Sequence, residues 1–398
     1  MGFKFIELFA GVGGFRQALD ELDGECVFAS EIDPFAVKAY RALYDGAAEL
    51  HGDITKIEAH DIPDHDVLVG GFPCQAFSVA GQRKGFEEAR GTLFFEIARI
   101  ASAKQPRLML LENVKGLLSH DGGKTFETMC TVLNDIGYAI DFRVLNSKHY
   151  GVPQNRERIF ICASRDAEHS DWIVSGNGVE AKAKRRAQDL GIRTFNFDWP
   201  TNDTVTTRLR DILETNVDER YYLSEEKTAK VLVRLESAPA ALIANIQQYS
   251  EGSGISYTID ANYAKGTSPG DIGKGRRTHV LQGIEYSRKS GIGRELDQAH
   301  CLSASDWRGL NRNQTQTAVL ETSPRYRIRK LTPLECWRLQ GFSDEAHNTV
   351  AAAGVSDSQR YKQAGNAVTV NVIRAIGERL VPLLGNSEHA PLLDSYSF

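Results

Sequence analysis

The first 165 residues alternate between short apolar runs and amphipathic stretches, and this alternation constrains the fold more than any other feature of the chain. The apolar runs have the length and composition of buried strands, and the stretches between them have helical periodicity. Such alternation is typical of an α/β sandwich with a mostly parallel sheet. The expected strands are residues 3–10, 26–30, 65–71, 107–113, 142–147 and 158–164, and the expected helices are 14–22, 35–43, 91–103 and 124–136.

The alternation ends after Ser164, where a long polar segment rich in Gly, Ser, Thr and Arg begins. Helical signals return near residue 332: Thr332 is a candidate N-cap, Pro333 occupies the first helical position and Gly341 lies near the end. We therefore expect a smaller, loop-rich domain inserted into an α/β domain. The expected divisions are 1–185 for the first part of the α/β domain, 186–325 for the inserted domain, 326–385 for C-terminal helices that complete the α/β domain, and 386–398 for a tail.

Composition narrows the class of protein. The chain has 398 residues and a net charge of −5, but residues 271–330 hold 12 Lys and Arg against 6 Asp and Glu, which suits a surface that faces phosphates. No apolar run approaches ~18 residues, so we expect no membrane span and a cytoplasmic protein. The six cysteines form no C-x-x-C pair and no cluster with histidine, so no metal site is expected.

A glycine-rich turn follows the first expected strand in FIELFAGVGGF, residues 5–15. Gly11 and Gly13 allow the backbone to turn tightly and to approach a ligand closely. Glu31 ends the second strand, where a carboxylate can accept hydrogen bonds from ribose hydroxyls, and Asp53 could read an adenine amino group. The pattern indicates a nucleoside-containing cofactor. It is not a full G-x-G-x-x-G, so NAD is not favoured, and a tight turn without a ligand is the alternative.

Cys74 has surroundings unlike those of a core cysteine. It follows Pro73 at the end of an apolar strand and precedes a charged, glycine-bearing segment that could close over a substrate. Glu112 follows the next apolar run, and Arg156 and Arg158 precede another. Because the carboxyl ends of strands line the crevice of an open α/β sheet, Cys74 and Glu112 are expected to share a pocket. Each charged residue alone also fits a solvated strand end.

Together these motifs resemble those of the DNA (cytosine-5) methyltransferases. The similar stretches occur in order within residues 3–163 and 329–375, and they are FAGVGGF, SEID, GFPCQAFS, RGTLFFE, LLENVKGL, YGVPQNRERIF, LTPLECWRLQGF and GNAVTVNV. The resemblance implies a Rossmann-like S-adenosylmethionine-dependent methyltransferase fold in which the inserted domain is a target-recognition domain. It also implies methyl transfer from S-adenosyl-L-methionine to C5 of cytosine in double-stranded DNA, with S-adenosyl-L-homocysteine as product.

The resemblance also implies which residues bind the cofactor. Glu31 would hold the ribose, Ile32 would pack on the adenine, and Asp53 would meet the adenine edge. Many members have an aromatic residue at the position of Ile32, so the adenine contact here would be aliphatic. The implied cofactor-binding residues are Phe9, Gly11, Gly13, Glu31, Ile32, Asp53, Ile54, Pro73, Asn366 and Val368.

The chemistry of cytosine gives four candidate catalytic residues their roles. Cytosine C5 is a poor nucleophile toward a sulfonium methyl, and addition of the Cys74 thiolate to C6 would move electron density onto C5. A protonated Glu112 that hydrogen-bonds N3 would ease this addition. Arg158 could bind O2, and Arg156 could support the charge of Cys74 or Glu112. Loss of the C5 proton would then release the cysteine.

The target base has to leave the helix, because C5 and C6 cannot be reached in this way inside a stacked duplex. Residues 75–90 are the expected lid, with Ser78, Gln82 and Arg83 as candidate DNA contacts. Side chains that can read base edges are also present in the inserted domain. The candidate readers are Arg276, Arg277, Arg308, Asn311 and Arg312. A Thr-Leu pair that is frequent in the family corresponds to Cys301-Leu302 here, and Thr258-Ile259 in a faintly similar earlier stretch is the alternative.

Double-stranded DNA is therefore the expected partner, in a prokaryotic or phage restriction–modification setting where a cognate restriction endonuclease would act separately. We expect a monomer. A tRNA cytosine-5 methyltransferase with the same core is the alternative, and the long middle domain favours duplex DNA. A binding module that has lost catalysis would not be expected to keep Cys74 and Glu112, and an NAD oxidoreductase would not explain the Pro-Cys-Gln stretch.

Overall fold

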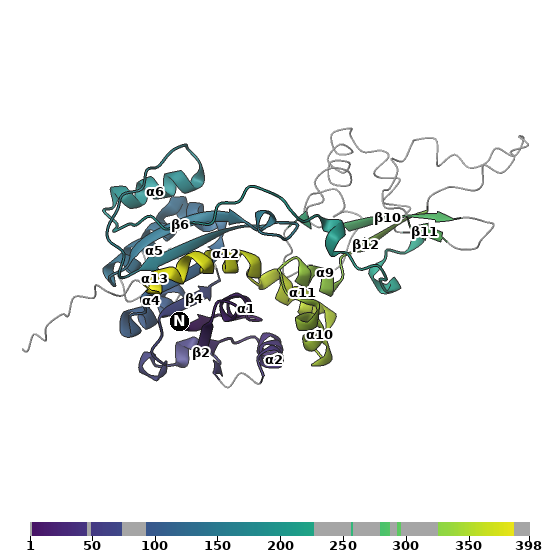
Figure 1. Ribbon diagram of the computed structural model, residues 1–398, viewed down its shortest axis with the longest axis horizontal. Coiled ribbons are helices and arrows are strands. Elements are labelled where there is room, and N and C mark those ends of the chain that lie inside the picture. Colours follow the sequence, from purple (N-terminus) through teal and green to yellow (C-terminus); the bar gives the residue numbers. More distant parts are fainter. Residues whose placement is uncertain are drawn as a thin grey trace, which may run out of the picture.

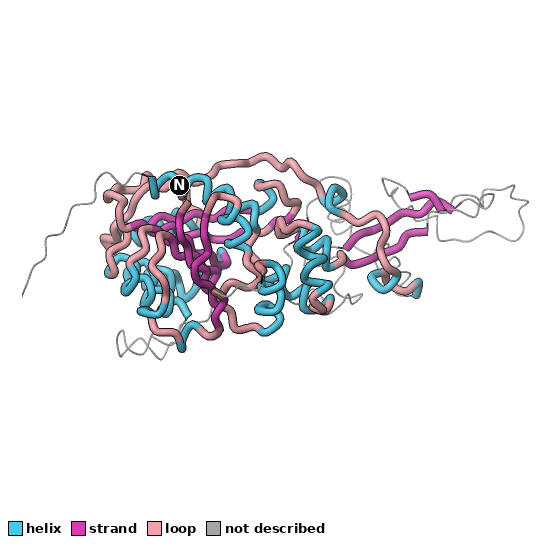
Figure 2. The backbone as a smooth tube through the Cα atoms, turned by 60° about the horizontal axis from the view of Figure 1, so that its bottom comes forward, coloured by secondary structure: helices cyan, strands magenta, loops and turns pink. Residues whose placement is uncertain are grey.

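A seven-stranded sheet lies at the centre of the computed structural model, which describes residues 2–45, 49–73, 93–226, 256–257, 279–286, 293–295 and 325–385. The strand order is β3-β2-β1-β4-β5-β8-β6. The strands lie together inside the body, with helices around them (Figures 1 and 2). The first five strands in this order run parallel, and β8 runs antiparallel to both β5 and β6. The strands are β1 (Phe3–Leu8), β2 (Gly24–Ser30), β3 (Leu50–His51), β4 (Val67–Gly71), β5 (Leu108–Val114), β6 (Ala139–Asn146) and β8 (Glu157–Ser164).

Helices cover both faces of this sheet. Side chains alternate between the faces, so Val67 and Val69 of β4 enter one hydrophobic core and Leu68 enters the other. The helices of the first core are α1 (Gly14–Asp20), α9 (Pro333–Arg338), α10 (Asp344–Ala352), α11 (Asp357–Asn366) and α12 (Val370–Leu380), and those of the second are α4 (Leu93–Lys104), α5 (Lys124–Asp135) and α6 (Val179–Asp189). The α/β sandwich with a mostly parallel sheet is therefore confirmed.

Local capping explains where two of the helices begin. The side chain of Asp33 accepts hydrogen bonds from the first turn of α2 (Pro34–Leu43). Thr332 caps α9 in the same way, and Glu335 completes the capping box by accepting from the Thr332 backbone N–H. The predicted start of α9, with Pro333 at its first position, is confirmed.

The segment after β8 packs on the body further than its composition predicts. The boundary expected at residue 185 falls inside α6, and Ile192 and Trp199 beyond it are buried in the two cores. The buried carboxylate of Asp141 on β6 accepts hydrogen bonds from Phe197 N (3.0 Å) and Trp199 Nε1 (2.8 Å). These contacts favour a later boundary than residue 185, and we propose that the first part of the α/β domain ends after Trp199.

A smaller sheet of order β11-β10-β12 extends away from the body (Figure 1). Strand β10 (His279–Tyr286) pairs antiparallel with both β11 (Gly293–Glu295) and β12 (Arg325–Lys330). The boundary expected at 325 thus falls at the start of β12, which pairs with the inserted segment and then leads into α9. Within the residues placed by the structure, no helix has both the length and the apolar character needed to cross a bilayer.

Candidate active site

The glycine-rich turn between β1 and α1 is packed closely on both sides. Gly13 has a φ of 80°, and a Cβ there would overlap the ring of Tyr44. A Cβ on Gly14 would lie 2.6 Å from Cγ2 of Val368. Glycine is therefore required at both positions, at the first by backbone conformation and space and at the second by space alone. The turn lies between α2 and the segment that enters α12.

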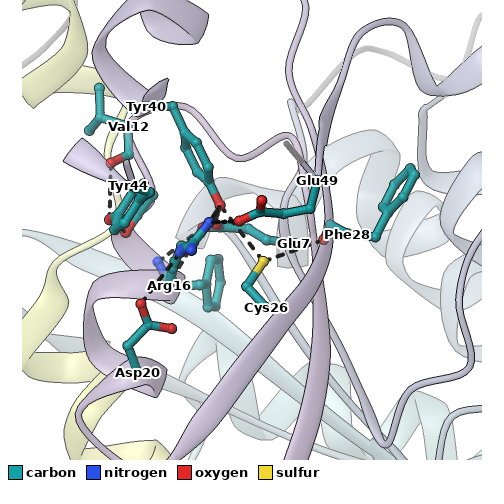
Figure 3. Close-up of polar contacts among 11 residues, drawn as sticks. Glu7, Val12, Arg16, Asp20, Cys26, Phe28, Tyr40, Tyr44 and Glu49 are labelled. Carbon is teal, nitrogen blue, oxygen red and sulfur yellow. Dashed lines mark hydrogen bonds and ion pairs between the residues drawn. The ribbon is translucent and has the colours of Figure 1, made fainter. Parts of the chain in front are cut away.

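The buried carboxyl group of Glu7 supports the end of this turn, where α1 begins (Figure 3). Helix α1 has Gly13 at its N-cap, which offers no side chain to the free N–H groups of the first turn. Glu7 of β1 takes that role, because its carboxyl accepts hydrogen bonds from Phe15 N (3.2 Å) and Arg16 N (3.4 Å). Tyr40 of α2 donates its hydroxyl hydrogen to the other Glu7 oxygen (3.2 Å). Burial raises the pKa of Glu7 to about 8.

Arg16 and Tyr44 connect the same turn to α2 (Figure 3). The Arg16 guanidinium donates to the Tyr40 hydroxyl (3.2 Å), pairs with Glu49 and lies 4.2 Å from the centre of the Tyr44 ring. Tyr44 in turn donates its hydroxyl hydrogen to Gly13 O (2.8 Å). The turn is thus held by a strand carboxyl, an arginine and two tyrosines rather than by its own hydrogen bonds alone.

The raised pKa of Glu7 predicts a pH-dependent stability. The folded state holds the Glu7 proton more tightly than the unfolded state. The contribution of this proton to the free energy of unfolding is therefore complete below about pH 4.5 and is lost as pH rises toward about 8. Glu7→Gln removes the ionisation and keeps the shape, so the wild type should lose free energy of unfolding relative to this variant between pH 5 and 8. We expect a difference on the order of a few kcal/mol in urea titrations. Plots of the free energy of unfolding against pH that run parallel for the wild type and Glu7→Gln would contradict this assignment. Glu25 is an exposed carboxylate on β2, so Glu25→Gln is the matched control.

A cavity of about 430 Å³ opens beside the glycine-rich turn. It runs from the carboxyl ends of β1 and β2 to the end of β5, as expected for a ligand crevice in an α/β sheet. All the implied cofactor-binding residues except Gly13 and Val368 line it. The lining members are Phe9, Gly11, Glu31, Ile32, Asp53, Ile54, Pro73 and Asn366.

Backbone N–H groups fix the Glu31 carboxylate at the edge of this cavity. One oxygen accepts from Gly11 N (2.8 Å), and the other accepts from Ile32 N (2.9 Å) and Asp33 N (2.7 Å). Carboxylate oxygens have further lone pairs, so a ribose diol could still bind. Ile32 is 68% exposed, which is unusual for an isoleucine beside a buried strand and suits a surface covered by a flat ligand.

At the other end of the cavity, Glu112 and Arg158 form an ion pair. Glu112 lies on β5 and Arg158 on the adjacent antiparallel β8, with Arg158 Nε 3.1 Å from Glu112 Oε1. Glu112 is only 8% exposed, and burial raises the pKa of its carboxyl while Arg158 and Arg156 act in the opposite direction. A carboxyl group in this environment can carry a proton at a pH where an exposed one would not.

The chain leaves β4 beside this ion pair. Gly71 of β4 is in register with Glu112, and a Cβ on Gly71 would lie 3.4 Å from Glu112 Oε2. Asn113 Nδ2 donates to Phe72 O (2.9 Å), which fixes the backbone just before Pro73. Cys74 comes next and lies outside the described residues, as do the DNA-contact candidates. These are Ser78, Gln82, Arg83, Arg276, Arg277, Arg308, Asn311 and Arg312, together with the pairs Cys301-Leu302 and Thr258-Ile259.

One wall of the cavity was not anticipated from the sequence. Helix α11 presents Gln359, Lys362 and Gln363 to the cavity, and Lys362 Nζ lies 2.5 Å from Asp33 Oδ2. Gln363 Nε2 donates to Phe35 O at the start of α2 (3.0 Å). The i, i+3, i+4 spacing of these polar residues, just before the Gly-Asn turn, was the available signal.

Residues 3–382 match the C-5 cytosine-specific DNA methylase family. The chain belongs to this family. The sequence-based resemblance is therefore confirmed, and with it the assignment of the body to the Rossmann-like fold of S-adenosylmethionine-dependent methyltransferases.

Relatives cover nearly the whole chain. It is 40% identical to the orphan methyltransferase M.SPRI of Bacillus phage SPR, over 97% of this chain and 99% of the relative. It is 38% identical to the type II methyltransferase M.SsoII of Shigella sonnei, over 96% of this chain and 81% of the relative. Among solved structures, the Dnmt2 methyltransferase of S. pombe aligns with a TM-score of 0.58 at 18% identity, over 96% of this chain and 99% of that one, which shows the fold.

Proposed function

We propose that this protein transfers a methyl group from S-adenosyl-L-methionine to C5 of a flipped-out cytosine in a specific double-stranded DNA sequence, through a covalent bond between Cys74 and cytosine C6. The observation that carries the proposal is the buried Glu112–Arg158 pair at the end of the cavity, beside the point where the chain reaches Cys74. Family membership supports the same reaction class.

The described residues fit this cofactor. An exposed Ile32, the anchored Glu31 carboxylate and the nearby Asp53 line one end of the cavity, and Asn366 lines the wall formed by the C-terminal helices. Gly13 and Val368 would act by packing behind the cavity wall. When bound, S-adenosylmethionine supplies an electrophilic sulfonium methyl group.

The chain's own residues would activate the base. The Cys74 thiolate forms a bond to C6, and the electron pair of the C5–C6 double bond moves to C5. Glu112 holds a proton at cytosine N3 during this addition, and Arg158, fixed by its ion pair with Glu112, would bind O2. After methylation, loss of the C5 proton restores the double bond and expels the cysteine sulfur as thiolate.

Methyl transfer from labelled S-adenosylmethionine to unmethylated duplex DNA and to tRNA tests this proposal. We expect label in duplex DNA, and bisulfite sequencing should then show modified cytosines in one sequence context. Label in tRNA alone would overturn the DNA assignment and support the tRNA alternative.

We further propose a restriction–modification or phage setting, because relatives include type II and phage orphan methyltransferases. In that setting the protein would act as a cytoplasmic monomer.

A further inference from the structure

Arg156 lies at a junction between the two ends of the cavity. It sits between β7 (Gln154–Asn155) and β8, two residues before Arg158, and it is only 3% exposed. Its backbone is fixed on both sides, because Arg156 N donates to Asn146 Oδ1 (3.1 Å) and Arg156 O accepts from Ser147 N (3.0 Å). The side chain therefore projects from a rigid base.

The guanidinium binds the turn that joins α11 to α12. Its Nη atoms donate to Gly365 O (3.3 Å) and Ala367 O (2.8 Å), the two carbonyls on either side of Asn366. The last carbonyls of a helix have no partner within the helix, and a cation at this end is electrostatically favourable. A planar, multidentate donor can hold both carbonyls at once. Asn366 lines the cavity and is thus presented by a turn that Arg156 holds.

A second polar contact docks the C-terminal helices elsewhere. Gln154 Nε2 donates to Leu339 O (2.8 Å), near the end of α9. Gln154 and Arg156 therefore both bind the C-terminal segment, but only Arg156 binds the turn that carries Asn366. Arg158, two residues on, binds Glu112. One short stretch of chain thus contacts both the base-activating carboxyl and the cofactor wall.

We propose that Arg156 is a positioning residue for the cofactor: it holds the turn at Asn366 at a fixed position relative to the Glu112–Arg158 pair. This inference rests on the proposed function. It differs from the expectation that Arg156 supports the charge of Cys74 or Glu112, because its hydrogen bonds to Gly365 and Ala367 give it a task on the cofactor side of the cavity.

Two measurements on the full-length enzyme separate these roles. The first is the dissociation constant for S-adenosylmethionine. The second is exchange of the cytosine C5 hydrogen in duplex DNA without cofactor: thiolate addition to C6 lets C5 take a deuteron from solvent, and loss of the original proton with expulsion of the thiolate completes the exchange. The wild type should bind the cofactor and catalyse the exchange, and failure of either contradicts the proposed function itself.

We expect Arg156→Lys to raise the dissociation constant by about ten-fold or more, a larger factor than its effect on C5 exchange, since lysine cannot hold both carbonyls in the same way. Arg156→Gln should weaken binding further, so the dissociation constant should rise from the wild type to Arg156→Lys and again to Arg156→Gln. Arg158→Lys should show the reverse pattern, with the larger loss in exchange.

Gln154→Ala is the matched control, because it removes a buried contact to the same C-terminal helices away from the turn. Thermal unfolding of each variant shows whether its folded state is populated at the assay temperature. Equal cofactor affinity in wild type and both Arg156 variants would overturn the inference. An equal loss of affinity in Gln154→Ala would overturn it as well, because general loosening of the C-terminal segment would then explain the effect.

Discussion

Replacing Cys74 with alanine is expected to reduce methyl transfer to duplex DNA by about 10⁴-fold or more, while the dissociation constant for S-adenosylmethionine changes by less than about three-fold. Without the sulfur, no group adds to C6 and C5 keeps its low nucleophilicity. The backbone that leads to Cys74 is fixed by the Asn113 contact to Phe72 O and by the register of Gly71 with Glu112. Methyl transfer is measured by capturing the DNA on filters after reaction with labelled S-adenosylmethionine, and the dissociation constant is measured by calorimetry.

The four cysteine thiols that the structure describes are poor substitutes for Cys74. Burial raises the pKa of Cys26, Cys130, Cys162 and Cys336, so none of them favours the thiolate. Cys130→Ala, on α5 in the second core and away from the cavity, is the matched control and should retain methyl transfer in the folded fraction. Substantial turnover by Cys74→Ala would remove Cys74 as the nucleophile.

The second large effect is expected for Glu112→Gln, with a loss of about 10²- to 10⁴-fold in kcat. An amide can donate a hydrogen bond to cytosine N3, but it cannot hold a transferable proton there. Because burial raises the pKa of Glu112, the protonated form extends to higher pH than for an exposed carboxyl, and wild-type activity should decline as pH rises through that pKa. In profiles of the rate against pH, the glutamine variant should lack this decline.

Another buried carboxyl group on the sheet provides the control for this experiment. Asp141 on β6 is even less exposed than Glu112, but it binds Trp199 and Phe197 at a distance from the cavity. Asp141→Asn should lower the free energy of unfolding without moving the pH profile of the folded enzyme. A Glu112→Gln variant with wild-type kcat and the wild-type pH profile would show that the proton at N3 comes from another group.

The strands and the polar residues at their ends could be predicted from the sequence. Strands β4 and β5 are buried on both faces, so they read as continuous apolar runs, and a polar residue at the end of such a run is conspicuous. For this reason the apolar pattern was enough to place Glu112 beside the exit of β4. The N-cap at Thr332 is local in the same sense, and it was predicted correctly.

Contacts between distant segments could not be predicted in this way. Arg156 and Arg158 are only two residues apart in the sequence, yet one binds Gly365 and Ala367 and the other binds Glu112. Their partners are set by how the C-terminal helices dock, and no local periodicity encodes that. The same reason applies to the polar face of α11 and to the contact between Trp199 and Asp141, neither of which a local pattern predicts.

The cavity is lined by segments from both ends of the described chain: the turn after β1 and, more than 300 residues later, α11. A ribosome that has just completed β8 has delivered Glu112, Arg158 and most of the residues that line the cavity, but it still has about 200 residues to add before Gly365 and Asn366 emerge. At typical elongation rates this interval lasts roughly 10 to 40 s. Under the proposed function, a nascent chain would therefore lack this wall of the cavity until its synthesis is nearly complete, and the length of the inserted segment largely sets that interval.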